Sequence, residues 1–279
     1  MSENGTGATA GSEDRVRIER VGDGGHVADV RLVRSDKHNA LDYAMFEALD
    51  AATDELAGAG DLRVVVLSGE GPSFCSGLDF PSFMATGKDL GEVLFGHRDG
   101  DEANFAQRVT YDWQRLEVPV IAALHGNCLG GGAQLALAAD IRIAAPDTRL
   151  SVLEVKYGLV PDMGITRSLP RLVGIDVAKE LVWSGRFVEG DELVKLGLAT
   201  RMAEDPHPAA LELAEEIASK SPDAIRSGKR LLNEAWNAGA AESLALEEEL
   251  QHALIGSPNQ IAAVQAAFSK EPAAFADPT

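Results

Sequence analysis

The sequence predicts an α/β fold, and two observations carry the prediction. Strand-like and helix-like segments alternate along residues 15–205, with glycine-rich loops between them. Three of the strand candidates are apolar throughout: "LRVVVLSG" at 62–69, "VPVIAALHG" at 118–126 and "ADIRIAA" at 139–145. Strands of this kind are buried on both faces, as in a sheet that helices cover on its two sides.

The first elements fit the same scheme. Two shorter segments, 15–21 and 26–33, alternate apolar and polar residues as strands do, and "GDGG" between them is a turn. A helix follows, because the apolar residues from Leu41 to Leu56 fall on one helical face. Asn39 is expected to cap its N-terminus.

Three regions divide the chain. Residues 1–14 are polar and glycine-rich, which predicts a disordered tail. Residues 15–205 form the α/β core, in which the irregular stretch 81–110 is expected to shape a pocket. Strand signals vanish from 206 to 279, where four helix candidates follow one another between Gly, Ser and Pro residues.

Composition limits the possible partners. The chain of 279 residues carries 25 basic and 44 acidic residues, a net charge of −19 that repels nucleic acid. Neither a signal peptide nor an apolar run of membrane-spanning length occurs, so no membrane association is expected. Two cysteines without a framework pattern, Cys75 and Cys128, indicate a reducing compartment. We therefore expect a cytoplasmic protein.

Several catalytic motifs are missing from the sequence. It contains no G-x-G-x-x-G after a strand, no P-loop lysine after its glycines and no G-x-S-x-G. Its six histidines lack metal-ligand spacing, so no metal is expected. An enzyme with this sequence has to work through carboxylates and backbone amides.

Three consecutive glycines, Gly130 to Gly132, precede the apolar run "AQLALAA". A helix N-terminus carries unpaired N–H groups, and without a Cβ the N–H of Gly131 can approach an oxyanion closely. Tight packing of a strand–helix turn also selects glycine, so this motif alone leaves both interpretations open. A second glycine-rich loop follows the strand at 62–69, and there Gly77 frees the backbone so that the Leu78 N–H can point into a cavity. Two such N–H donors are what an oxyanion hole needs.

These segments together resemble the enoyl-CoA hydratase/isomerase (crotonase) superfamily. "SFCSGLD" and "GNCLGGGAQLALAADIRIAA" are similar to its two oxyanion segments, and "RLSVLEVKYGLVPDMGITRSLPRLVG" to its catalytic-carboxylate segment. "SDKHNALD" resembles its early coenzyme A-contacting turn, and "FSKEPAAF" its C-terminal signature. The similarity runs in order from about residue 15 to residue 275.

The resemblance implies a fold, a ligand and an assembly. The fold is a crotonase-like spiral of ββα units with a helical C-terminal trimerisation region, in a homotrimer or a dimer of trimers. The ligand is an acyl-CoA, whose coenzyme A belongs to the substrate, so that no separate cofactor is implied. The thioester oxygen would accept hydrogen bonds from the N–H groups of Leu78 and Gly131. The implied coenzyme A contacts are Lys37, Ala40, Ser76, Leu78, Asp79, Phe80, Gly131 and Lys270.

Two positions of the family usually carry acids, and this sequence has Gln134 at one and Glu154 at the other. A neutral amide cannot transfer protons, although it can hold a water or a thioester by hydrogen bonds. Glu154 matches the proton shuttle of family isomerases, the alternative being a surface ion pair with Lys156. Asp162 matches an aspartate of the dienoyl-CoA isomerase branch, and it also suits the N-cap of the helix that follows.

These residues favour an enzyme that isomerises a double bond of an unsaturated acyl-CoA, with Glu154 as the main acid and base and Asp162 as its auxiliary. Hydration of a 2-enoyl-CoA is the alternative reaction. Acyl-CoA hydrolysis or decarboxylation uses the same oxyanion hole and stays open. A non-catalytic RNA-binding member would need a basic patch, which the sequence lacks.

Overall fold

The computed structural model describes residues 15–85 and 90–278, and the expected tail at 1–14 lies outside them. A six-stranded sheet runs through the centre of the molecule in the order β1-β2-β3-β4-β6-β9. Only the β1–β2 pair is antiparallel, and every later pair is parallel. The strands are β1 (Val16–Val21), β2 (Val27–Leu32), β3 (Val64–Gly69), β4 (Val120–Leu124), β6 (Ile141–Ala144) and β9 (Arg201–Met202). The three apolar strand candidates are thereby confirmed as β3, β4 and β6, and β3 and β4 are buried almost throughout.

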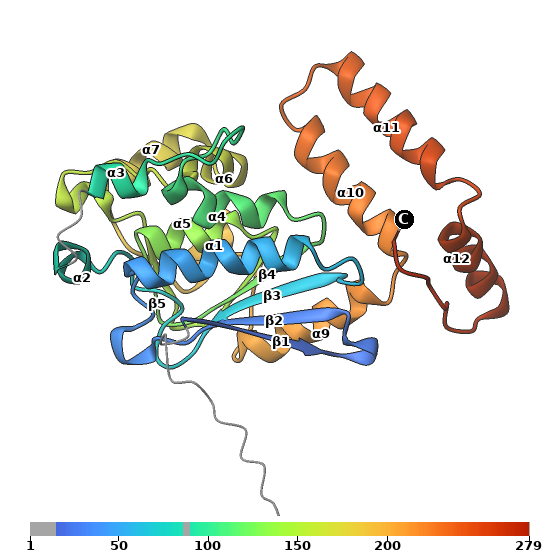
Figure 1. Cartoon of the computed structure of the whole chain (residues 1–279), viewed down its shortest axis with the longest axis horizontal. Helices are drawn as coiled ribbons and strands as arrows, with labels where there is room; N and C mark the ends of the chain where they lie inside the picture. Colours follow the sequence, from blue (N-terminus) through green and yellow to red (C-terminus); the bar gives the residue numbers. More distant parts are fainter. Residues whose placement is uncertain (1–14, 86–89, 279) are drawn as a thin grey trace, which may run out of the picture.

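Helices cover both faces of this sheet, as Figure 1 shows. One face packs against α1 (Tyr43–Ala57), α4 (Phe105–Arg115) and α5 (Gly131–Ala138), and their buried side chains form the larger core cluster. The other face packs against α9 (Pro206–Ala218), whose Ala210 and Ala214 are fully buried beside β3, β4 and β6. Small residues suit this contact because they let the helix approach the sheet closely.

A second, three-stranded sheet contains the strands that follow β4 and β6 in the chain. It consists of β5 (Asn127–Leu129), β7 (Arg149–Ser151) and β8 (Val188–Glu189). The chain therefore passes from β4 through β5 into α5, and from β6 into β7, before each path turns away from the sheets. This is the expected spiral of ββα units. A shorter pairing of the same kind follows β3, where the backbones of Cys75 and of Cys128 in β5 form an isolated parallel β-bridge.

Shorter helices complete the core. They are α2 (Phe80–Ala85), α3 (Leu90–Leu94), α6 (Ile165–Leu172), α7 (Ile175–Ser184) and α8 (Asp191–Leu196), with 3₁₀ turns η1 (Asp23–Gly25), η2 (Ser35–Lys37) and η3 (Glu154–Tyr157). The excursion expected at 81–110 contains α2, α3 and the start of α4.

The last three helices extend beyond the sheet. They are α10 (Pro222–Ala235), α11 (Ala240–Leu254) and α12 (Pro258–Ser269), and in Figure 1 they project from one end of the core. Four helices after residue 205 were expected, and four are present, although α9 packs on the sheet while α10–α12 do not. The role of 206–279 in oligomerisation stays a prediction. Within the described residues, no helix has the length and apolar character that crossing a bilayer requires.

One predicted cap is wrong. Asp42, and not Asn39, caps α1, because its side chain accepts a hydrogen bond from the Met45 N–H at 2.9 Å. Asn39 instead lies fully buried in a left-handed conformation, and its amide donates to the carbonyl groups of Glu70 and Ser73. Its side chain thus ties the turn after β2 to the loop after β3, which a local capping rule cannot anticipate.

Candidate active site

Three loops meet at the carboxyl ends of the parallel strands. The Leu41 N–H donates to the Gly77 carbonyl at 2.8 Å, and the Leu129 N–H donates to the Cys75 carbonyl at 3.0 Å. Segments 35–42, 73–80 and 126–132 therefore lie side by side, although 30 to 50 residues of sequence separate them. The two glycine-rich loops that the sequence analysis singled out are among these three.

Each of the three consecutive glycines has its own structural cause. Gly130 has a φ of 53°, a conformation that L side chains rarely adopt. A Cβ on Gly131 would lie 2.8 Å from both Leu41 Cδ1 and Met163 Sδ, and a Cβ on Gly132 would collide with the Cys75 carbonyl. Close packing of the strand–helix turn therefore explains much of the motif. Because Gly131 is the first residue of α5, its N–H has no partner inside the helix.

The backbone around Leu78 is arranged to turn one N–H outward. Its two neighbours bond to Leu41, since Gly77 accepts from the Leu41 N–H and the Asp79 N–H donates to the Leu41 carbonyl at 2.9 Å. In a parallel ladder the residue between them directs its own N–H to the opposite side. Gly77, with φ 87°, lies against the Leu129 carbonyl and the Cα of Gly130. The use of the Leu78 and Gly131 N–H groups as one oxyanion hole stays a prediction.

Glu154 and Gln134 form one hydrogen-bonded pair. Gln134 Nε2 donates to Glu154 Oε1 at 2.6 Å, while Gln134 Oε1 accepts from the Met163 N–H at 2.9 Å. The amide is thus fixed at both ends, with its NH₂ group on the carboxylate. Glu154 Oε2 is buried and has no hydrogen-bond partner among residues 15–85 and 90–278. Among the described residues, Glu154 forms no ion pair with Lys156. The alternative that Glu154 is only the partner of Lys156 in a surface ion pair is therefore wrong.

The surroundings of Glu154 shift the pKa of its carboxyl upward. Burial raises the pKa of the Glu154 carboxyl, and the nearby charge of Asp162 adds to the rise, although the Gln134 hydrogen bond opposes it. Burial also raises the pKa of Asp162. Two carboxyls with raised pKa values at one place are typical of groups that exchange protons near neutral pH.

Asp162 does not cap a helix. The helix α6 begins at Ile165 with Gly164 as its N-cap, and no side chain caps it. The capping alternative for Asp162 is therefore wrong. Its neighbour Met163 is buried and bonded to Gln134, so Asp162 is held at the edge of the Glu154 site.

Four of the eight predicted coenzyme A contacts lie in two separate parts of the structure. Lys37, Ala40 and Ser76 lie together, because the Ser76 N–H donates to the His38 carbonyl at 3.0 Å and Ser76 Oγ to the Lys37 carbonyl. Lys270 stands alone at the end of α12, which Figure 1 places at the opposite end of the molecule from α2 and β5.

Of the four remaining contacts, Leu78 and Gly131 are also the predicted oxyanion donors, and Asp79 and Phe80 already have protein partners. Asp79 pairs with Arg34 at 2.8 Å and accepts from Ser82 Oγ at 2.7 Å. Although burial opposes it, the hydrogen bonds from Ser82 and Arg34 hold the pKa of Asp79 below its ordinary value. The Phe80 ring packs 4.9 Å from the Tyr157 ring, so α2 and η3 meet beside Glu154.

Three further residues contribute to this site. Leu41 and Met163 pack on Gly131, and Thr110 of α4 donates a hydrogen bond to the Met163 carbonyl. Leu41 and Met163 lie inside quoted motifs but have no predicted role, and Thr110 lies outside every motif, because a threonine at a helical position looks like ordinary core. Within the described residues, no His, Cys, Asp and Glu side chains gather in a group that could hold a metal ion.

The spiral thus places the N-terminus of α5, which begins at Gly131, beside the hydrogen-bonded pair of Gln134 and Glu154. Comparison with known proteins gives the family. A sequence profile described as "Enoyl-CoA hydratase/isomerase" matches residues 22–277, and the chain belongs to that family.

Relatives with different named activities are about equally similar to the chain. It is 33% identical to the mitochondrial Delta(3,5)-Delta(2,4)-dienoyl-CoA isomerase of Mus musculus, with 88% of this chain and 77% of that protein covered. It is 30% identical to the mitochondrial methylglutaconyl-CoA hydratase of Mus musculus, with 94% and 83% covered. The crystal structure of an enoyl-CoA hydratase from Bacillus anthracis superposes with a TM-score of 0.83 at 29% identity, over 94% of this chain and 98% of that one.

Proposed function

We propose that this enzyme moves a double bond along an unsaturated acyl-CoA through an enolate intermediate. The observation that carries the proposal is the Gln134–Glu154 pair. Gln134 occupies the place of a second acid but cannot titrate, and its amide is already held by Met163 and Glu154. One carboxylate oxygen, Glu154 Oε2, is left to move protons at this point.

In the proposed reaction, Glu154 Oε2 removes a proton from the carbon next to the thioester carbonyl. The electron pair of that C–H bond passes into an enolate, whose oxygen accepts hydrogen bonds from the N–H groups of Leu78 and Gly131. The double bond shifts when the same carboxyl returns the proton to a carbon further along the chain. The proton is conserved, so no other reactant is consumed. Asp162 is proposed to assist at the more distant carbon.

Hydration of a 2-enoyl-CoA is the second candidate. The amide of Gln134 has two N–H groups, and in the part of the chain that the structure describes it donates one hydrogen bond, to Glu154. The other N–H can orient a water for Glu154 to activate. The similarity to a methylglutaconyl-CoA hydratase supports this reaction as much as the similarity to a dienoyl-CoA isomerase supports the first.

We propose that further residues contact the coenzyme A part of the bound substrate. Lys37, Ala40 and Ser76 would line the coenzyme A path, and the exposed ammonium of Lys37 would meet a phosphate group. We propose a trimeric assembly, or a dimer of trimers, in the cytoplasm. Support for the assembly comes from large apolar side chains that α10 and α12 leave exposed, among them Leu232, Trp236 and Phe268.

A panel of 2-enoyl-, 3-enoyl- and 3,5-dienoyl-CoA substrates, with identification of products by mass and chromatography, tests the proposal. Isomerisation conserves the substrate mass, whereas hydration adds the mass of water. Rapid isomerisation of a 3-enoyl- or dienoyl-CoA supports the proposal. Rapid hydration of 2-enoyl-CoAs, with the other substrates inert, contradicts it and assigns Gln134 to the water.

A further inference from the structure

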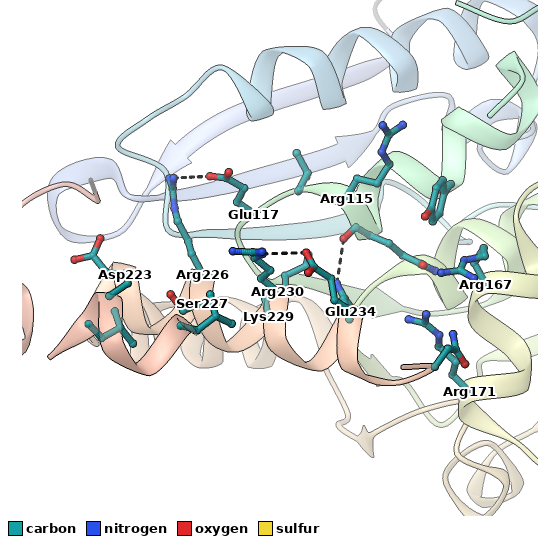
Figure 2. Close-up of a pocket in the computed structure, with 18 of the residues that line it drawn as sticks. Arg115, Glu117, Arg167, Arg171, Asp223, Arg226, Ser227, Lys229, Arg230 and Glu234 are labelled. Atoms are coloured by element: carbon teal, nitrogen blue, oxygen red, sulfur yellow. Dashed lines mark hydrogen bonds and ion pairs between the residues drawn. The ribbon is translucent and has the colours of Figure 1, made fainter. Parts of the chain in front are cut away.

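One cavity of the described residues is lined by side chains that do not include Glu154. It has a volume of about 940 Å³ and lies between α4 and α6 of the core and the projecting helices α10 and α11. Figure 2 shows several of its charged side chains facing one another across the space. Six of the residues that line it are cationic: Arg115, Arg167, Arg171, Arg226, Lys229 and Arg230.

Four of these six cations already have acidic partners. Arg226 pairs with Glu117 at 2.8 Å and Arg230 with Glu234 at 3.0 Å, and both pairs are visible in Figure 2. Arg115 pairs with Asp101 and Asp112, and Lys229 pairs with Asp140. Two of the three acids that line the cavity, Glu117 and Glu234, are therefore paired with Arg226 and Arg230, and the third, Asp223, accepts from Asn259.

Arg167 and Arg171 differ from the other four. Neither takes part in an ion pair or a side-chain hydrogen bond among the residues that the structure describes. They stand four residues apart on α6, so their guanidinium groups share one face of the helix and repel each other. Partial burial lowers the pKa of Arg171, and the charge of Arg167 lowers it further. Figure 2 places both at one end of the cavity, away from the pairs of Arg226 and Arg230.

The ring of Tyr111 completes this end of the cavity. The Arg167 guanidinium carbon lies 6.0 Å from the centre of the ring, and that of Arg115 lies 5.8 Å from it. These cation–π contacts stabilise the positions of Arg167 and Arg115, but the ring supplies no negative charge to balance the charge of a guanidinium group. Arg167 is exposed and Arg171 is half-buried, so both guanidinium groups can be reached by an anion from solution, in a chain whose net charge is −19.

We propose that Arg167 and Arg171 form an anion site that takes a carboxylate or phosphate group. Arginine forks bind such groups with two parallel hydrogen bonds each, which accounts for a pair of guanidinium groups with no protein partner. Neither Glu154 nor Gln134 lines this cavity, so the proposed anion site is not the Glu154 site. The anion comes either from a small molecule in solution or from a carboxylate side chain of a second copy of this chain.

Titration calorimetry with inorganic phosphate and with citrate, at constant ionic strength, tests the first source. The proteins to compare are the wild type, Arg171→Gln, Arg167→Gln and the matched control Arg230→Gln, which removes a paired cation from the same cavity. Loss of one charge-assisted contact is expected to weaken binding about tenfold or more in the first two variants, and not in the control.

Sedimentation of the same four proteins tests the second source. If a neighbouring carboxylate fills the site, Arg171→Gln shifts the assembly towards smaller species at micromolar concentration while Arg230→Gln does not, and phosphate binds none of them. The proposal is overturned if phosphate and citrate do not bind and all four proteins sediment alike, or if Arg230→Gln has the same effect as Arg171→Gln. Acyl-CoA turnover is measured in parallel, since failure of the proposed function alone would leave these results unchanged.

Discussion

Gln134 and Glu154 share one hydrogen bond, and their unequal chemistry makes the first prediction. Replacing Glu154 by Gln removes the only group of the pair that titrates. Turnover should fall by roughly 10²–10⁴-fold, the usual worth of general acid–base catalysis, while acyl-CoA binding stays nearly unchanged because the proposed oxyanion donors are backbone groups. Steady-state kinetics together with binding of a saturated acyl-CoA measures both effects.

Gln134→Ala is the comparison for this experiment. It leaves Glu154 in place but removes the hydrogen bonds to Glu154 and to the Met163 N–H. Its loss of turnover should be smaller than that of Glu154→Gln. An equal loss in both variants would mean that Gln134 holds a reacting water or the substrate itself, which would favour hydration.

The charge of Asp162 gives the second prediction, which concerns pH. Burial and Asp162 together raise the pKa of Glu154, and Glu154 must be ionised to accept a proton. Activity should therefore rise with pH through this raised pKa. Asp162→Asn removes the negative charge, lowers the pKa of Glu154 and should move the acidic limb of the kcat/KM profile to lower pH.

Asp176→Asn is the control for the pH experiment, since Asp176 is an exposed aspartate on α7. It should leave the acidic limb where it is. An acidic limb that also stays in place in Asp162→Asn would show that Asp162 does not act on Glu154 electrostatically, even if turnover falls.

At the scale of elements, α4 and α6 hold the segment that carries Asp162. Thr110 of α4 is buried, and its hydroxyl donates to the carbonyl of Met163, the residue after Asp162. Thr110→Val keeps the shape of the side chain but leaves that carbonyl unpaired, which costs about 1–3 kcal/mol of the free energy of unfolding. We expect a lower kcat with a smaller change in KM, measured beside chemical denaturation.

Thr110→Ser separates positioning from packing in this prediction. Serine restores the hydroxyl and removes only a methyl group, so kcat should recover. If Thr110→Ser is as slow as Thr110→Val, the methyl group and not the hydrogen bond is what matters at this position.

The elements that sequence patterns predicted well are those whose pattern is local. Continuous apolar runs gave β3, β4 and β6, and helical spacing gave α1 and the four C-terminal helices. The glycine-rich motifs located the loops that meet at the site. What the patterns could not supply were contacts between distant segments. The Gln134–Met163 bond, the Thr110 hydroxyl and the cross-loop role of Asn39 depend on tertiary packing, and no spacing rule encodes it.

The whole molecule presents a surface that a single chain does not explain. Leu232 on α10 is 70% exposed, Trp236 directly after α10 is 61% exposed, and Phe268 on α12 is 86% exposed. Side chains of this kind are what the proposed assembly would cover. Sedimentation at micromolar concentration should show a trimer or a dimer of trimers, and a monomer would contradict the assembly.

Lys270 tests whether that assembly also completes the site. It follows directly on α12, which Figure 1 places at the opposite end of the molecule from α2 and β5, so the proposed contact with coenzyme A has to come from a neighbouring copy. Glu154→Gln and Lys270→Glu should each lower kcat/KM when they are alone, the first through turnover and the second through a raised KM. When the two variants are co-expressed, some sites combine an intact Glu154 from one chain with an intact Lys270 from another, and kcat/KM should partly recover. If Lys270 instead served its own chain, every site in the mixed assembly would carry one of the two changes, and no recovery would occur.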